Sequence, residues 1–191
     1  MASLILGVAA AAACNDKPAA PAASRVDSVA ADPKQGPSTE GFCDVRAPAE
    51  RAPAFQFPAL AGAAPPAATG WRWINVWATW CKPCLEELPR LHRWKDRLSA
   101  AGRKLDLAFV SVDESDDVVA AFRKAHPEAP DSARLADPAG LPAWLKALGL
   151  DEGAPIPIHV FVDPSGHTRC VRAGGVGEAD YEVVERVVTG S

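Results

Sequence analysis

The stretch Trp71 to Cys84, with the sequence WRWINVWATWCKPC, decides the fold of this chain. Its first eight residues are rich in aromatic and β-branched side chains and predict a buried strand. The two cysteines, Cys81 and Cys84, follow where this strand gives way to a helix. We expect that helix to run from about Lys82 to Ala100, because leucines recur there at helical spacing.

Strand and helix patterns alternate through the rest of the chain. Further strands are expected at Leu105 to Val112, Ile158 to Val162 and Thr168 to Ala173, the last two forming a hairpin. Further helices are expected at Leu141 to Leu148 and Glu178 to Val188. Ser115 is expected to cap another helix that turns Val118, Val119 and Phe122 toward the core. This order predicts an α/β fold, a small mixed central sheet with helices on both faces.

The composition is that of a globular protein. The chain has 191 residues, 48% of them hydrophobic and 23% charged, which suits one buried core. Its net charge of −4 argues against binding nucleic acid through a basic surface. No apolar run reaches the length of about 18 residues that would span a bilayer.

The N-terminal residues 1–14 resemble a bacterial lipoprotein signal. An apolar segment from Leu4 to Ala13 ends in three alanines immediately before Cys14. The resemblance implies cleavage before Cys14, lipid modification of that cysteine, and a folded part attached to a membrane outside the cytoplasm. An unprocessed alanine-rich start is the alternative.

Residues 15–41 are expected to form a disordered tether. They contain four prolines, six alanines and no aromatic side chain. Such a segment cannot bury enough apolar surface to offset the entropy lost on ordering. The folded domain is therefore expected to occupy residues 42–191.

The segment Cys81-Lys82-Pro83-Cys84 carries the chemistry. At a helix N terminus, unpaired backbone N–H groups and the helix dipole favour the thiolate of Cys81, the form that attacks disulfides. Cys84, one turn further along, can attack the resulting mixed disulfide. Half of a zinc site is one alternative, but no second CxxC or closely spaced Cys/His pair follows. A structural disulfide is another, but so short a loop adds little stability.

The motif WATWCKPC at positions 77–84, followed by Glu87 and Pro89, resembles the active-site segment of the TlpA/ResA/DsbE family of thioredoxin-like, extracytoplasmic thiol–disulfide oxidoreductases. The resemblance extends to Val112-Asp113-Glu114 and to the segment PIHVFVD that begins at Pro157. It covers roughly residues 53–188. It implies a thioredoxin-like fold.

The family resemblance also implies roles for single residues. Cys81 would be the nucleophile, Cys84 the resolving thiol, and Pro157 a cis-proline facing the CxxC. The backbone of Ile156 would then be free to pair with an extended substrate segment. From the residues alone, Pro155 could carry the cis bond instead, or neither proline could.

Two further side chains are candidates beside the cysteines. Glu87 lies three residues after Cys84 and so on the same side of the helix, where it could accept the Cys84 proton; a solvated helix charge is the alternative. Thioredoxin has a buried aspartate six residues before its first cysteine, but here that position holds Asn75, which cannot take up a proton, so any acceptor must lie elsewhere. Glu87 could instead raise the pKa of the Cys84 thiol by repulsion. Trp80 is expected to shelter Cys81 and to offer an apolar docking face.

The remaining cysteines and one histidine complete the set of candidates. Cys43 and Cys170 could form a disulfide that attaches the N-terminal segment to the hairpin, or both could be unpaired thiols. His159 follows Pro157 by two residues on a strand, so both side chains point the same way. We favour a structural role for this histidine and leave it outside the catalytic set.

These observations predict an enzyme, a tethered thiol–disulfide oxidoreductase that reduces disulfides in extracytoplasmic proteins. We expect no metal and no cofactor other than the Cys81–Cys84 disulfide. The family resemblance suggests apocytochrome c or a copper-site protein as substrate, and a membrane thiol transporter as electron donor. A peroxiredoxin-like peroxidase is one alternative, although it would need a threonine where this chain has Ala78. A Cu(I) carrier that binds through the CxxC thiolates is the other.

Overall fold

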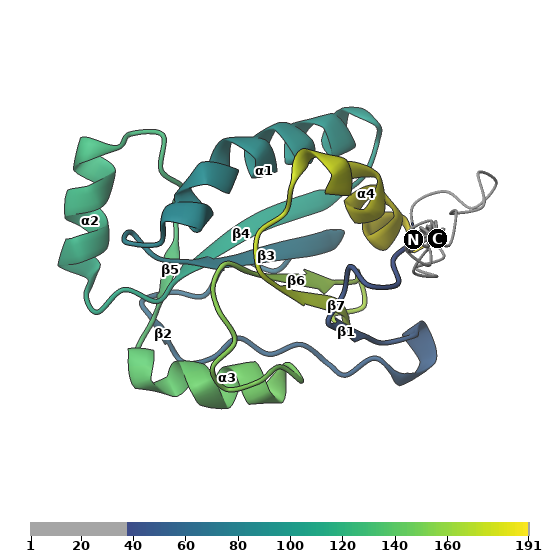
Figure 1. Ribbon diagram of the computed structural model, residues 1–191, viewed down its shortest axis with the longest axis horizontal. Coiled ribbons are helices and arrows are strands. Elements are labelled where there is room, and N and C mark those ends of the chain that lie inside the picture. Colours follow the sequence, from purple (N-terminus) through teal and green to yellow (C-terminus); the bar gives the residue numbers. More distant parts are fainter. Residues whose placement is uncertain (1–37, 191) are drawn as a thin grey trace, which may run out of the picture. The chain divides into compact units, whose positions relative to one another are not determined.

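One mixed sheet runs through residues 38–190, the part of the chain that this computed structural model describes (Figure 1). Its strands lie in the order β1-β7-β6-β3-β4-β5-β2, with β3 parallel to β4 and antiparallel to β6. In chain order they are β1 (Val45–Arg46), β2 (Leu60–Ala61), β3 (Trp71–Trp77), β4 (Leu105–Ser111), β5 (Ala133–Leu135), β6 (Ile158–Val162) and β7 (Thr168–Ala173). The predicted signal segment with Cys14, and residues 15–37 of the predicted tether, lie outside the described residues.

Helices cover both faces of this sheet, with α1 and α4 on one face and α3 on the other (Figure 1). The α-helices are α1 (Lys82–Ala100), α2 (Asp116–Ala125), α3 (Leu141–Ala147) and α4 (Tyr181–Thr189). Three 3₁₀ turns are η1 (Ala49–Arg51), η2 (Pro138–Gly140) and η3 (Glu178–Asp180). The predicted α/β architecture is confirmed. No helix between residues 38 and 190 is both long and apolar enough to cross a membrane.

The helix after the cysteines has the predicted bounds. Cys81 is its N-cap and Pro83 lies in its first turn, where a missing N–H costs nothing. The chain leaves the helix through Gly102, whose φ of 78° is readily adopted only without a Cβ. Between these ends Leu88, Leu91, Trp94 and Leu98 are buried. The amphipathic pattern therefore sets the orientation of α1 as well as its length.

Other expectations are corrected in detail. Ser115 does cap α2, since its side chain accepts a hydrogen bond from the Val118 N–H. Val119 is buried and Phe122 packs against the core, but Val118 is 43% exposed, so its predicted inward position is wrong. On a helix Val118 lies about 100° from Val119, and the buried face of this short helix is too narrow for both. The sequence pattern also missed β1, β2 and β5, which are only two or three residues long.

Aromatic packing fixes the centre of the molecule. Trp73 on β3 stacks on Phe161 of β6 at 5.1 Å between ring centroids, and on Trp94 of α1 at 6.4 Å. Side chains alternate along a strand, so Asn75 and Trp77 share the face of β3 that Trp73 occupies. The Asn75 amide thus lies beneath α1, between the fully buried indoles of Trp73 and Trp77.

A disulfide joins the start of the described chain to the sheet. Cys43 is bonded to Cys170 of β7, and directly afterwards β1 pairs with the same strand, with Val45 opposite Val171. Cys170 is buried, with 1% of its surface exposed. The bond closes a loop with a sequence separation of 127 residues. In the chain-entropy model a loop of that length contributes about 5 kcal/mol.

We predict that the double substitution Cys43→Ala and Cys170→Ala lowers the free energy of unfolding by about 3–5 kcal/mol, because the unfolded chain regains the freedom that the crosslink removed. Guanidinium denaturation of the oxidised protein measures the change. The control is Cys81→Ser with Cys84→Ser, which opens a loop with a sequence separation of only 3 and should cost much less. Equal losses in the two double variants would contradict the entropic account.

Candidate active site

The two cysteines of the motif form a disulfide at the first turn of α1. Cys81 Sγ accepts a hydrogen bond from the Cys84 backbone N–H at 3.3 Å, so the sulfur itself caps the helix. Cys81 is 4% exposed and Cys84 is fully buried. Only Cys81 can therefore meet a large partner first. Helix N termini favour negative charge, which suits a Cys81 thiolate once the disulfide is reduced.

A buried carboxylate holds the loop that presents these cysteines. Asp113, 1% exposed, follows the C-terminal end of β4. It accepts hydrogen bonds from the Thr79 N–H at 3.0 Å, the Thr79 hydroxyl at 2.7 Å and the Ser111 hydroxyl at 2.6 Å. Sequence reasoning used Asp113 only as part of the family resemblance and assigned it no role. Its contacts show that it fixes the turn from β3 into α1.

The cis peptide bond lies between Ile156 and Pro157, and Pro155 is trans. The carbonyl oxygen of Ile156 lies 3.9 Å from Cys81 Sγ, so this bond faces the disulfide. Within residues 38–190, the Ile156 N–H donates no hydrogen bond. An extended segment laid beside Cys81 could therefore accept from it, as an added strand does.

An apolar groove adjoins Cys81. It has a volume of about 680 Å³ and is lined by side chains that include Trp80, Val112, Leu141 and Ile156. Trp80 is 69% exposed, which is unusual for so large an apolar side chain. The groove thus offers apolar surface next to the reactive sulfur.

Glu87 lies buried between α1 and the sheet. It is 2% exposed, whereas Glu86 points to solvent, so the helix carries the two carboxylates on different sides. Its Oε1 accepts from Asn75 Nδ2 at 2.8 Å, and its Oε2 accepts from the Val176 N–H at 3.0 Å. A buried carboxylate requires such donors. Glu87 and Cys84 both lie on the inward side of α1, in a part of the molecule that water does not reach.

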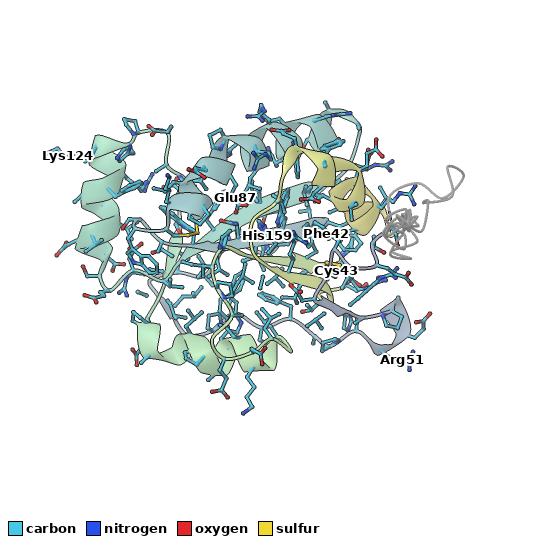
Figure 2. The ribbon with its side chains drawn as sticks, in the orientation of Figure 1. Phe42, Cys43, Arg51, Glu87, Lys124 and His159 are labelled. Atoms are coloured by element: carbon cyan, nitrogen blue, oxygen red, sulfur yellow. A yellow bond between two sulfur atoms is a disulfide. The ribbon has the colours of Figure 1, made fainter. Side chains whose placement is uncertain are left out.

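His159 also belongs to this buried cluster (Figure 2). It is fully buried, and its Nε2 lies 3.4 Å from Glu87 Oε1. Trp73 Nε1–H donates to its Nδ1 at 3.1 Å. The sequence alone favours a structural position for this histidine. The two-residue spacing from Pro157 was the signal that placed its side chain on the face of the active site.

The loop after β7 packs against this cluster. Gly175 leaves room for Glu87, because a Cβ there would lie 3.3 Å from Glu87 Oε2. Arg90 of α1 donates to the Val176 carbonyl at 2.6 Å and to Glu178 at 3.1 Å. The hydrogen bond from Arg90 lowers the pKa of Glu178 below its ordinary value. No role is assigned to this loop from the sequence, although three of the four residues from Gly174 to Gly177 are glycines.

Fold and site together define a thioredoxin-like protein with a CxxC disulfide. No family model matches the chain. The chain is 31% identical over 113 residues to the thiol:disulfide interchange protein DsbE homolog of Paracoccus denitrificans, covering 59% of this chain and 55% of that one. It is 26% identical over 93 residues to the thiol-disulfide oxidoreductase ResA of Bacillus cereus, covering 49% of each. The predicted resemblance to the TlpA/ResA/DsbE family is thereby confirmed.

Solved structures share the thioredoxin-like fold. A secreted thiol-disulfide isomerase from Corynebacterium glutamicum matches with a TM-score of 0.56 and 20% identity, over 81% of this chain and 97% of that one. A thioredoxin-related protein from Neisseria meningitidis matches with a TM-score of 0.50 and 24% identity, over 63% of this chain and 86% of that one. The chain spans about half the length, or less, of the curated relatives that it matches.

We predict that Asp113→Ala lowers the free energy of unfolding by about 3 kcal/mol, because it leaves the half-buried Thr79 N–H and the Ser111 hydroxyl without their acceptor. Chemical denaturation measures the loss. The matched control is Glu114→Ala, an exposed neighbour whose removal should change stability by less than about 0.5 kcal/mol. Similar values for the two variants would show that Asp113 does not anchor the turn.

Proposed function

We propose that this chain is a thiol–disulfide oxidoreductase that reduces disulfides in other proteins. The observation that carries the proposal is the disulfide between Cys81 and Cys84 at the N terminus of α1, opposite the Ile156 carbonyl. The curated relatives are named as oxidoreductases or interchange proteins, which supports the same activity.

In the reduced protein, Cys81 is the proposed nucleophile. Its thiolate attacks one sulfur of a substrate disulfide, a Cys81–substrate bond forms, and the other substrate sulfur leaves as a thiolate that takes a proton from solvent. In the disulfide-bonded protein the Cys84 N–H donates to Cys81 Sγ, and in the reduced protein the same N–H would stabilise the Cys81 thiolate.

Cys84 then resolves the mixed disulfide. Its thiol gives its proton to the Glu87 carboxylate, its sulfur attacks Cys81, and the Cys81–Cys84 bond forms as the substrate sulfur leaves. The substrate gains two electrons and the dithiol loses them. Because Cys84 is fully buried, we propose a buried acceptor for its proton, and Glu87 is a carboxylate on the same inward side of α1.

The substrate is proposed to bind as an extended segment with apolar residues beside its cysteine. The Ile156 backbone would pair with the segment, and Trp80 and the apolar groove would take its side chains. Pro157 supports this arrangement by turning the Ile156 backbone toward Cys81.

We further propose an extracytoplasmic location with lipid attachment at Cys14. The lipoprotein-like residues 1–14 and the Cys43–Cys170 bond support it, because such bonds persist in oxidising compartments. Within that setting we propose an apocytochrome c or a copper-site protein as substrate and a membrane thiol transporter as electron donor. The proposed substrate and electron donor rest on the family resemblance.

Replacing the resolving thiol should trap partners. We predict that Cys84→Ser, expressed in the native host, retains substrate proteins through a Cys81 mixed disulfide, since nothing remains to release them. Non-reducing gels and mass spectrometry identify the bound proteins. The control is the double variant Cys81→Ser with Cys84→Ser, which should trap none. Equal recovery from both would end the assignment of Cys81 as nucleophile.

The two thiols should also differ in reactivity. We predict that in the reduced protein iodoacetamide alkylates Cys81 at least tenfold faster than Cys84 at pH 7, because only Cys81 has both surface access and the helix N terminus. Peptide mapping after timed quenching measures both rates. Similar rates at every pH would contradict the role given to the helix terminus.

A further inference from the structure

His159 is a buried side chain that the exchange steps above do not use. It lies on β6, opposite Asn75 of β3 in the strand register. Directly opposite residues of paired strands share a face, and Asn75 donates to Glu87 of α1, so the His159 ring is on the sheet face that α1 covers. Figure 2 shows His159 at the sheet with Glu87 nearby.

The neighbouring indole decides which nitrogen of His159 carries the proton. An indole N–H only donates, and Trp73 Nε1 lies 3.1 Å from His159 Nδ1. Nδ1 is therefore the acceptor, and in the neutral ring the proton is on Nε2. Among the described residues, this Nε2 makes no hydrogen bond of ordinary length. It faces Glu87 Oε1 at 3.4 Å, just beyond the usual range.

A buried N–H without an acceptor is costly, and the Glu87 carboxylate needs to move only slightly to accept from this one. When Glu87 is ionised, its Oε1 is a strong acceptor for the His159 N–H. The histidine can therefore hold the Glu87 carboxylate in the orientation that accepts the Cys84 proton.

We infer that His159 is a positioning residue for the redox reaction, which through its Nε2–H keeps the Glu87 carboxylate oriented and ready to take the proton of Cys84. The inference rests on the proposed function. His159 itself gains and loses no proton; the proton of Cys84 passes to Glu87 as the Cys81–Cys84 bond forms.

Other groups share the contact with Glu87. From β3, Asn75 donates to the same oxygen, Oε1; from the loop after β7, the Val176 N–H donates to Oε2. On α1, Cys84 lies one turn before Glu87 and Arg90 one turn after it, with the Arg90 guanidinium held by the Val176 carbonyl and Glu178. Two donors thus remain without His159. Its removal should slow the reaction without abolishing it.

The test compares His159→Leu with His159→Gln in the full chain. The reduced proteins react with insulin, a disulfide substrate, in single turnovers at pH 7. We expect His159→Leu to slow the reaction about tenfold, because Glu87 then loses the side chain that orients it to take the proton of Cys84. His159→Gln should restore most of the rate, since an amide can accept from Trp73 and donate to Glu87.

Double substitution separates positioning from packing. Adding His159→Leu to Glu87→Gln should cause no further loss, because the histidine acts through Glu87. The matched control is His167→Leu, which removes a histidine 3.8 Å from the Asp163 carboxylate on the β6–β7 hairpin and should leave the rate unchanged. Circular dichroism checks that each variant is folded.

Two results would overturn the inference: a His159→Gln variant as slow as His159→Leu, or losses that multiply in the double variant. A failure of the proposed function looks different. In that case the unaltered protein would reduce insulin no faster than Cys81→Ser does.

Discussion

The junction between β3 and α1 is the constraint on which the rest of the structure depends. An aromatic strand, buried on both faces, ends where Asp113 accepts three hydrogen bonds from the adjoining turn and strand end. The next helix therefore begins at a defined position, and Cys81 caps it. Without that anchor the sulfur would lose both its place at the helix terminus and its contact with the Ile156 carbonyl.

The same junction explains why polar groups lie in the core. A strand that feeds a helix placed over its own sheet brings the inward face of the helix against the side chains of that strand. Here Glu87 meets Asn75, and the cross-strand neighbour of Asn75 is His159. Burying a carboxylate is expensive, and each donor around it offsets part of that cost. The free-energy cost of burying Glu87, Asn75 and His159 together is consistent with a chemical role for these side chains.

Charged side chains close this cluster from the surface. Arg90 and Arg93 of α1 both donate to Glu178, and Arg90 also holds the Val176 carbonyl. The loop after β7 is thus attached to α1 by exposed ion pairs, which contribute little stability singly. Its backbone supplies the donor to Glu87 Oε2. The exposed ion pairs to Glu178 therefore hold in place the loop that donates the buried hydrogen bond to Glu87.

By itself the sequence determined the β3–α1 unit, the hairpin of β6 and β7, and the two cysteines at the helix start. These features depend on residues close together in the chain, through period-two and helical spacing and through capping. Only the tertiary structure decided that Cys43 bonds to Cys170, that Pro157 is cis, and that His159 faces Glu87. Those contacts join distant segments, and the register between strands, which local spacing does not encode, sets which side chains meet.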